Sequence, residues 1–259
     1  MGSILWRGVP ARIPIQQLAR DREQGGLKLQ LPALKCKALL LNRHLQEIDS
    51  IPYYKSFILQ VNPNPINPPS QFPCLKLFCV QFPQIPMAVR RNPSVDLLHR
   101  LAVEQQTEVP KVMRNSPAVN WIRVWQNIAM RQLTPMQPNV LYIFVNEKTK
   151  HRKLMNTIQR ADGEDCLHCG AAIETLKHKF SECQRVADAW LLVRNKFTII
   201  SRGRHTLSFD DLLKPSLEGV GRTQRLKILK ICSEFIEHVN CSDNVVDSQA
   251  LEFKIDCLM

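Results

Sequence analysis

The stretch that decides the fold runs from Cys166 to Cys183 and reads CLHCGAAIETLKHKFSEC. Its cysteines and its second histidine follow the spacing Cys-x2-Cys-x8-His-x4-Cys. Two cysteines separated by two residues can bind one metal ion from a tight turn, and Gly170 follows where the chain must bend. Three thiolates and one imidazole form a tetrahedral set that is common in structural zinc sites. The sequence therefore predicts a structural Zn2+ site, a small CCHC zinc knuckle, formed by Cys166, Cys169, His178 and Cys183.

Three details of the stretch refine this prediction. His168 lies between the paired cysteines, where its side chain would point away from the metal that they share, so we favour His178 as the ligand. Thr175 can cap a short turn that presents the imidazole of His178. Because protein side chains fill all four positions, the metal is expected to be structural and not catalytic. The alternative is a set of thiols and an imidazole with no common metal, which accounts less well for their tight clustering.

Apolar residues at helical spacing predict helices on both sides of this stretch. Before it, one apolar face covers residues 121–129, and a second helix is predicted over 141–159 with basic residues near its end. After it, helices are predicted over 184–196 and 226–239, and residues 240–259 are expected to fray. The predicted inward faces comprise Trp121, Val124, Trp125, Ile128, Ala129, Val186, Ala189, Trp190, Val193, Leu226, Leu229, Cys232, Phe235, Ile236 and Val239.

The rest of the chain divides into a helical N-terminal piece, residues 1–60, and a proline-rich linker, residues 61–94. One predicted helical face in the N-terminal piece is formed by Leu34, Ala38, Leu41, Leu45 and Ile48. In the linker, prolines remove backbone donors and fix φ so often that regular structure cannot continue. The fold class is therefore mainly α, and the linker leads to a helical domain, residues 95–239, in which the knuckle region spans about 121–197.

The composition points to a polyanionic partner. The 259 residues include 35 Lys+Arg against 23 Asp+Glu, a formal net charge of +12, and so basic a chain first suggests RNA or DNA. Hydrophobic residues make up 44%, which excludes wholesale disorder. The stretch before the knuckle predicts phosphate contacts by Lys148, Lys150, Arg152 and Lys153. On its own such a stretch is more typical of a solvated helix face, and tryptophans at helical spacing are more typical of a core than of a base-stacking surface.

We recognise no targeting feature in the sequence. Residues 1–12 contain no long apolar segment typical of a signal peptide, and no stretch of about 18 apolar residues is present that would span a bilayer. The nine cysteines are an odd number in a chain without an export signal, so we expect thiols and metal ligands in place of disulfides. These features predict an intracellular protein of the nucleus or the cytoplasm, not secreted and without a membrane partner.

The order of several short motifs resembles that in reverse transcriptases of LINE-type, non-LTR retrotransposons. Leu5–Gly8, Gly25–Leu27 and Lys37–Leu39 resemble the stretch after the polymerase palm. Trp121–Ile128 resembles the region before the terminal zinc knuckle of that family, and Cys166–Trp190 resembles the knuckle itself. The resemblance implies a thumb-like role for the N-terminal piece and nucleic-acid binding by the knuckle. It also implies the same four zinc ligands that the spacing predicts.

The chain departs from this family at the catalytic centre. The family's polymerase needs adjacent aspartates, preceded at two positions by an aromatic residue, to hold magnesium. The only such pair here is Asp210-Asp211, which follows the knuckle and, after Ser208, is typical of a capped helix start. We therefore expect a C-terminal fragment, from a truncated element or a partial gene model, that binds RNA or DNA and the remainder of its polyprotein. No catalysis and no small-molecule substrate are expected, and the alternative is a zinc-stapled protein-interaction module without a nucleic-acid role.

Overall fold

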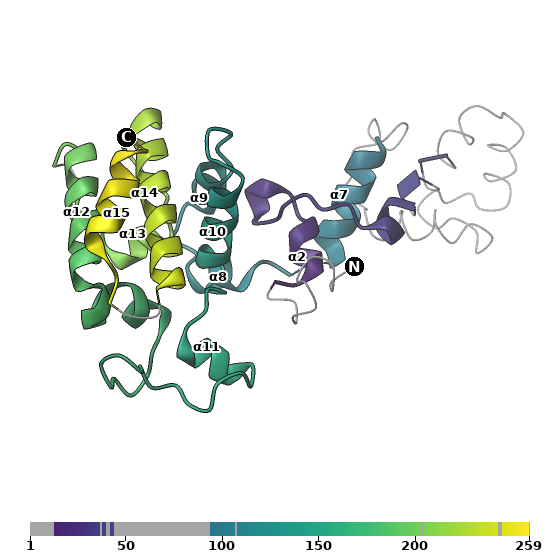
Figure 1. Cartoon of the computed structure of the whole chain (residues 1–259). Helices are drawn as coiled ribbons and strands as arrows, with labels where there is room; N and C mark the ends of the chain where they lie inside the picture. Colours follow the sequence, from purple (N-terminus) through teal and green to yellow (C-terminus); the bar gives the residue numbers. More distant parts are fainter. Residues whose placement is uncertain are drawn as a thin grey trace, which may run out of the picture. The chain divides into compact units, whose positions relative to one another are not determined.

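The computed structural model of the chain describes residues 13–36, 38–39, 42–43, 94–106, 108–203, 205–242 and 245–258. These residues are mainly helical, and no strand occurs among them, which confirms the predicted fold class (Figure 1). They divide into two compact units. The smaller unit comprises 14–21 and the described residues between 26 and 108. The larger unit comprises residue 13, residues 22–25 and the described residues from 109 onward.

The smaller unit contains helices α2 (Ile15–Ala19) and α7 (Val95–Gln106), with further helical turns over 32–36. Its core is formed by Ala19, Leu34 and Val103. His99, which is 6% exposed, accepts a hydrogen bond at Nε2 from the backbone N–H of Leu31 at 3.3 Å. Burial lowers the pKa of His99 below its ordinary value, so the imidazole is held neutral and can accept this bond.

The predicted N-terminal face and linker are only partly within the described residues. Leu34 and Ala38 are buried, as that face requires. Leu41, Leu45 and Ile48 lie outside the described residues, and so does the linker up to residue 93. Helix α7 packs against α2 in the smaller unit, and the larger unit resumes at residue 109.

The larger unit also includes the short 3-10 helix Arg22–Gln24, which is followed by Gly25. This 3-10 helix packs against α9 (Trp121–Ile128). Gly25 adopts φ +81°, and a Cβ atom at this position would lie 2.9 Å from a ring carbon of Trp125. The hydroxyl of Tyr142 donates a hydrogen bond to the Gly25 carbonyl at 2.8 Å. Glycine is thus required here both by backbone conformation and by the close approach of an aromatic ring.

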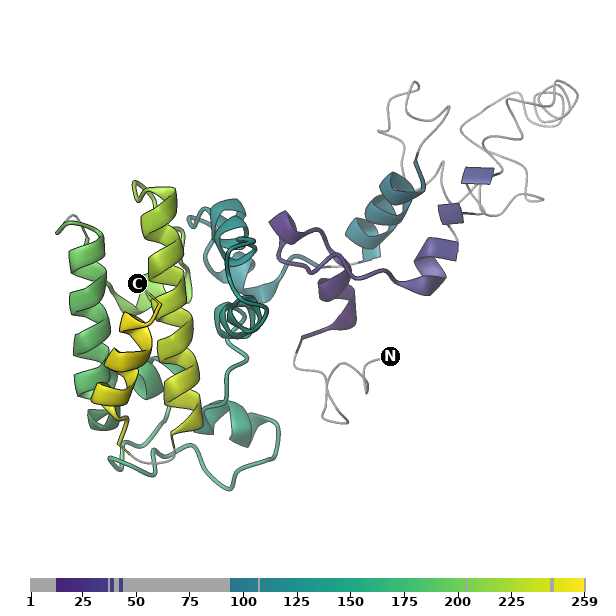
Figure 2. The same cartoon turned by 45° about the horizontal axis from the view of Figure 1, so that its top comes forward.

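Most of the larger unit is a helical bundle around α14. Its helices are α8 (Lys111–Asn115), α9 (Trp121–Ile128), α10 (Met136–Val145), α11 (Arg152–Thr157), α12 (Ala187–Ile200), α13 (Phe209–Leu213), α14 (Arg222–Cys241) and α15 (Ser248–Asp256). Helix α14 packs against α9, α10, α12 and α15. Figures 1 and 2 show α12, α14 and α15 side by side. None of the helices in the described ranges is long and apolar enough to cross a membrane.

Most residues of the predicted apolar faces are buried in the bundle core, whereas Ala129, Trp190 and Leu226 are half-buried. In α14, Leu229, Cys232 and Phe235 are buried along one side, with Ile236 and Val239. In α9, Trp121 and Trp125 stack on each other with ring centroids 5.6 Å apart and are 6% and 3% exposed. These tryptophans therefore belong to the core and do not form a surface for base stacking.

The predicted helix over 141–159 is wrong, because the chain turns in its middle. Helix α10 ends at Val145, and Asn146 Nδ2 donates a hydrogen bond to the Tyr142 carbonyl at 2.9 Å. Glu147 then takes up a left-handed conformation with φ 57°. The backbone N–H of Asn146 donates to the same Tyr142 carbonyl at 3.2 Å, and the added side-chain bond stabilises the end of the helix at this point. Helix α11 starts only at Arg152.

Within the described residues 245–258, the tail forms helix α15 and does not fray as predicted. Asp247 accepts hydrogen bonds from the backbone N–H groups of Gln249 and Ala250 and so caps α15. Leu251 and Ile255 are fully buried. An apolar pair at this helical spacing gives even a short C-terminal segment a face to bury against the bundle.

The aspartate pair lies at a helix start, as predicted. Ser208 is the N-cap of α13, and its hydroxyl accepts a hydrogen bond from the backbone N–H of Asp211 at 3.1 Å. The Asp211 carboxylate in turn accepts one from the backbone N–H of Ser208 at 3.0 Å. This reciprocal capping box stabilises the start of α13 and explains the position of the Asp211 carboxylate.

Candidate metal centre

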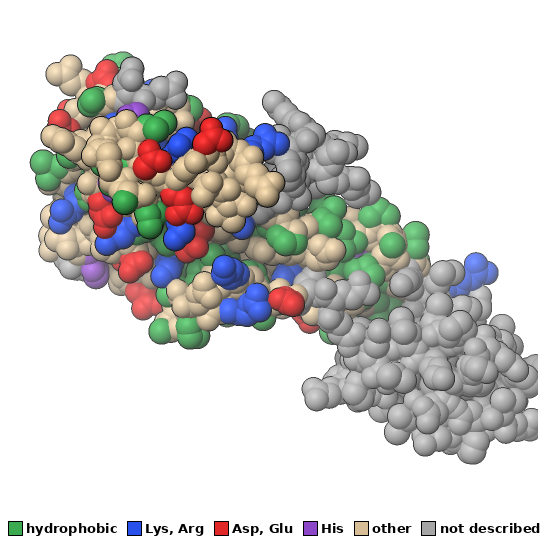
Figure 3. Space-filling view, turned by 90° about the horizontal axis from the view of Figure 1, so that it is seen from below, with side chains coloured by type: hydrophobic (Ala, Val, Ile, Leu, Met, Phe, Trp, Pro, Cys, Tyr) green, Lys and Arg blue, Asp and Glu red, His purple; other side chains and the backbone are tan. Residues whose placement is uncertain are grey.

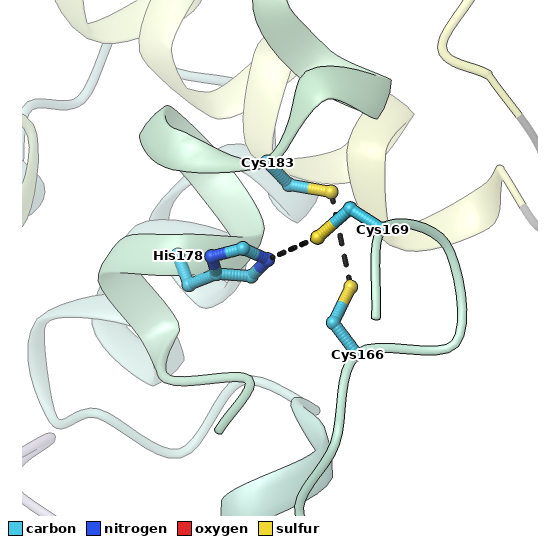
Figure 4. Close-up of side chains that lie close together, drawn as sticks. All are labelled: Cys166, Cys169, His178 and Cys183. Atoms are coloured by element: carbon cyan, nitrogen blue, oxygen red, sulfur yellow. Dashed lines mark hydrogen bonds between the residues drawn. The ribbon is translucent and has the colours of Figure 1, made fainter. Parts of the chain in front are cut away.

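The structure brings together the four predicted metal ligands. One ligand atom from each of Cys166, Cys169, His178 and Cys183 lies within 4.8 Å of all the others. The sulfur atoms of Cys166 and Cys183 are 3.8 Å apart, and the Cys169 sulfur is 3.2 Å from His178 Nε2 (Figure 4). A tetrahedral zinc ion with Zn–S distances of about 2.3 Å separates two sulfur ligands by about 3.8 Å. The donor set and its spacing therefore fit a zinc ion.

A tight turn over residues 166–171 presents the first two cysteines. The Cys166 N–H donates a hydrogen bond to the Ala171 carbonyl at 2.8 Å, and the Gly170 N–H donates one to the Cys166 carbonyl at 2.9 Å. Gly170 adopts φ +71°, a left-handed conformation that favours glycine. The glycine after the paired cysteines thus closes the turn, as its place in the sequence predicts.

Backbone hydrogen bonds to the two sulfur atoms of this turn favour their thiolate form. The Cys166 sulfur accepts from the backbone N–H groups of His168 and Cys169, and the Cys169 sulfur accepts from that of Ala171. The bond from Ala171 lowers the pKa of the exposed Cys169 thiol. Burial is the larger effect at Cys166 and raises its pKa to about 11. In the absence of metal the Cys166 thiol is therefore protonated at neutral pH.

A short π-helix, His178–Glu182, presents the other two ligands. Thr175 caps this segment, as predicted, because its hydroxyl accepts a hydrogen bond from the His178 backbone N–H at 3.0 Å. The Cys183 N–H then donates to the His178 carbonyl at 2.8 Å. Figure 4 shows the cysteine turn on one side and the His178–Cys183 segment on the other. His168 is exposed and does not belong to the cluster, in agreement with the choice of His178.

Glu174 connects the knuckle to the start of α11. This carboxylate is 7% exposed and accepts a hydrogen bond from the backbone N–H of Arg152 at 2.9 Å. The Glu174 carbonyl accepts a second bond from the N–H of Lys153 at 3.2 Å. A carboxylate at a helix N-terminus satisfies a free N–H group and interacts favourably with the helix dipole. The sequence contains Glu174 in the stretch before His178 but gives no sign that it would cap a helix upstream.

Lys179 connects the knuckle to two further segments. Its ammonium group donates to the Lys150 carbonyl at 2.7 Å and to Asn240 Oδ1 at 3.1 Å. Burial lowers the pKa of Lys179 to about 8. Sequence reasoning missed this residue because a lysine beside a metal ligand is normally solvated. Its position shows that the knuckle, the basic stretch and the end of α14 form one hydrogen-bonded assembly.

The four predicted phosphate contacts do not lie on one helix face. Lys148 and Lys150 belong to the turn after α10, whereas Arg152 and Lys153 open α11. Lys150 and Lys153 are exposed, while Lys148 and Arg152 are half-buried. The Arg152 guanidinium lies 3.9 Å from the Asp165 carboxylate. On the face shown in Figure 3, Lys and Arg side chains lie among Asp and Glu side chains.

Zinc affinity is expected to rise with pH around neutrality. Because the metal-free Cys166 thiol has a pKa of about 11, zinc must displace its proton to bind. This thiol alone predicts a gain of about tenfold in apparent affinity for each unit of pH, and the affinity falls correspondingly as pH decreases. Competition with a chromophoric chelator at several pH values measures the dependence. Cys232→Ala, which removes a buried thiol outside the cluster, serves as the control and is expected to leave the slope unchanged. An affinity that is constant with pH would argue against Cys166 as a ligand.

No protein-family model, no curated protein and no solved structure matches this chain.

Proposed function

We propose that this chain binds RNA or DNA through a surface that a structural zinc ion organises beside residues 148–153. The observation that carries the proposal is the direct attachment of this basic stretch to the knuckle. Lys179 donates to the Lys150 carbonyl, and Glu174 accepts from the Arg152 N–H. The four metal ligands support the proposal, and so does the formal charge of +12. Contacts between basic side chains and phosphates supply most of the affinity in non-specific nucleic-acid binding.

The motif order supports a further proposal about origin. We propose a relationship to the C-terminal, thumb-and-knuckle part of LINE-type reverse transcriptases, acting in the nucleus or the cytoplasm. Within this proposal the chain binds nucleic acid without polymerising it. Asp211 is occupied in the cap of α13, and a zinc ion with four protein ligands leaves no open position for catalysis. The remainder of such a polyprotein would then be a natural partner of this chain.

Neutralising the basic stretch is expected to reduce the salt dependence of binding. The variant carries Lys148→Gln, Lys150→Gln, Arg152→Gln and Lys153→Gln. Each phosphate contact to a single strand contributes about 0.7 to the slope of log affinity against log salt, so the slope should flatten by up to about three units. Fluorescence anisotropy of a labelled single-stranded RNA across a salt series measures it. Glu174 accepts from the backbone N–H of Arg152 and Lys179 donates to the backbone carbonyl of Lys150, so the side-chain substitutions leave both hydrogen bonds in place.

A charge-matched control separates a local contact from a general loss of positive charge. It replaces four exposed basic residues outside the knuckle with glutamine, namely Lys111, Arg131, Arg194 and Lys254. This variant has the same net charge as the first but is expected to retain most of the slope. Equal slopes for the two variants would show that residues 148–153 are a solvated surface without phosphate contacts of their own.

One observation favours a protein-interaction module as the second candidate. Two apolar side chains of the knuckle are exposed, Leu167 at 69% and Ile173 at 47%. Exposed apolar groups on a small rigid element are typical of a contact surface for another protein. An RNA affinity that hardly changes with salt, in zinc-loaded protein, would favour this candidate over nucleic-acid binding.

A further inference from the structure

An open cavity of about 540 Å³ lies between the end of α12 and the start of α14. Apolar side chains form one part of its lining, with Ile199, Ile200 and Val220. Basic or ionisable side chains form another part, with Arg202, His205 and Lys227. The cavity lies at the opposite end of α12 from the metal centre, since the knuckle leads directly into the first turn of that helix.

The cavity has the charge expected of an anion site. No Asp or Glu is among its lining residues. Neither Arg202 nor Lys227 forms an ion pair with any residue in the described part of the chain. Elsewhere in this unit, Lys196 and Lys214 do lie beside carboxylates. Two cationic side chains that line one cavity, with no carboxylate among the lining residues, favour an anionic ligand.

The size and the apolar wall indicate more than a bare phosphate ion. Binding sites for small organic ligands typically have volumes of about 300–1,000 Å³ and combine apolar walls with a few polar groups. Here Ile199 is 69% exposed beside Ile200 and presents an apolar surface next to the cations. A phosphate joined through a sugar to a flat aromatic base, whose faces can pack on apolar side chains, matches both halves of the lining.

We propose that this cavity binds a nucleoside monophosphate unit, with its phosphate at Arg202 and Lys227 and its base against Ile199 and Ile200. The unit is either a free nucleotide or one nucleotide of a strand, because both present the same phosphate and base. The site goes beyond the nucleic-acid surface proposed at the knuckle, and neither its lining nor its test involves the metal ligands.

Calorimetric titration of the full-length, zinc-loaded chain tests the proposal with three probes: adenosine 5′-monophosphate, adenosine and inorganic phosphate. The nucleotide is expected to bind saturably, and each of the other probes about tenfold or more weakly, because each supplies only half of the contacts. Arg202→Gln with Lys227→Gln should weaken nucleotide binding by about tenfold or more. The matched control, Arg131→Gln with Arg194→Gln, removes two exposed cations outside the cavity and should change affinity by less than about twofold.

The outcomes distinguish a free nucleotide from one nucleotide of a strand, and they distinguish failure of this site from failure of the proposed function. If a short single-stranded DNA competes with the nucleotide, the cavity holds part of a strand; if it does not, the cavity holds a free nucleotide. Absence of saturable nucleotide binding, or equal losses in both double variants when both unfold at the wild-type temperature, would overturn the site. Failure here leaves the salt slope of the knuckle variants unaffected, so it is distinct from failure of the proposed function.

Discussion

Purified protein is expected to contain one zinc ion per chain, and Cys166→Ser with Cys183→Ser is expected to reduce that content to near zero. Both sulfur atoms are buried, at 2% exposure for each residue, so the double substitution leaves two ligands and no closed site. Structural zinc contributes roughly 10–16 kcal/mol of binding free energy in small knuckles, which makes this the largest effect predicted here. Elemental analysis of dialysed protein gives the stoichiometry.

The matched control for metal content is Cys257→Ser, which removes an exposed cysteine outside the cluster and should leave one zinc per chain. Chelation should unfold the region around residues 160–195 and release residues 150–153, because Glu174 and Lys179 hold that stretch. The helices of the smaller unit should stay largely protected in hydrogen exchange. A zinc content near zero in the wild-type chain, or one that is unchanged in the double variant, would refute the metal centre.

Phe180→Ala is expected to destabilise the zinc-loaded protein by about 3–5 kcal/mol. Phe180 lies in the π-helix between the ligands His178 and Cys183, yet its ring is fully buried in the bundle. Its centroid is 4.9 Å from that of Phe144 and 6.1 Å from that of Phe235, both edge-to-face. Truncation leaves a cavity where the knuckle enters the core. Denaturant unfolding at saturating zinc measures the change in free energy.

Phe253→Ala provides the control for this substitution. Phe253 lies on α15 and is 73% exposed, so the same chemical change should alter the unfolding free energy by no more than about 0.5 kcal/mol. Metal affinity should also fall in Phe180→Ala, since the helix that carries His178 loses its anchor. Similar stabilities for the two variants would show that the knuckle does not share the bundle core.

The metal ligands could be predicted because their chemistry is local. The spacing from Cys166 to Cys183, with Gly170 and Thr175 at the turns, fixes two short segments whose donors must converge. The buried faces of α9 and α14 could also be predicted, because apolar residues at a spacing of three and four positions lie on one side of a helix. Capping of α13 by Ser208 follows from the same kind of local rule.

Features that depend on distant residues could not be predicted. Nothing around Glu147 in the sequence opposes a helix strongly. The turn there is stabilised by a distant residue, because Lys179 donates a hydrogen bond to the Lys150 carbonyl at 2.7 Å. Ordering of the tail needs partners far away in sequence: the Arg185 guanidinium donates to the Ser242 carbonyl at 2.6 Å, and Lys196 pairs with Asp256 at 2.7 Å. Long-range contacts of this kind override local propensity.

Binding of a labelled single-stranded RNA by zinc-loaded, chelated and reloaded protein tests most directly whether the knuckle builds a nucleic-acid surface. Anisotropy across a salt series gives both the affinity and the salt slope in each state. Removal of zinc should weaken binding by about tenfold or more and flatten the slope, and one equivalent of zinc should restore both. An affinity and a slope that stay the same after the metal content has fallen to zero would contradict the proposal that zinc organises this surface.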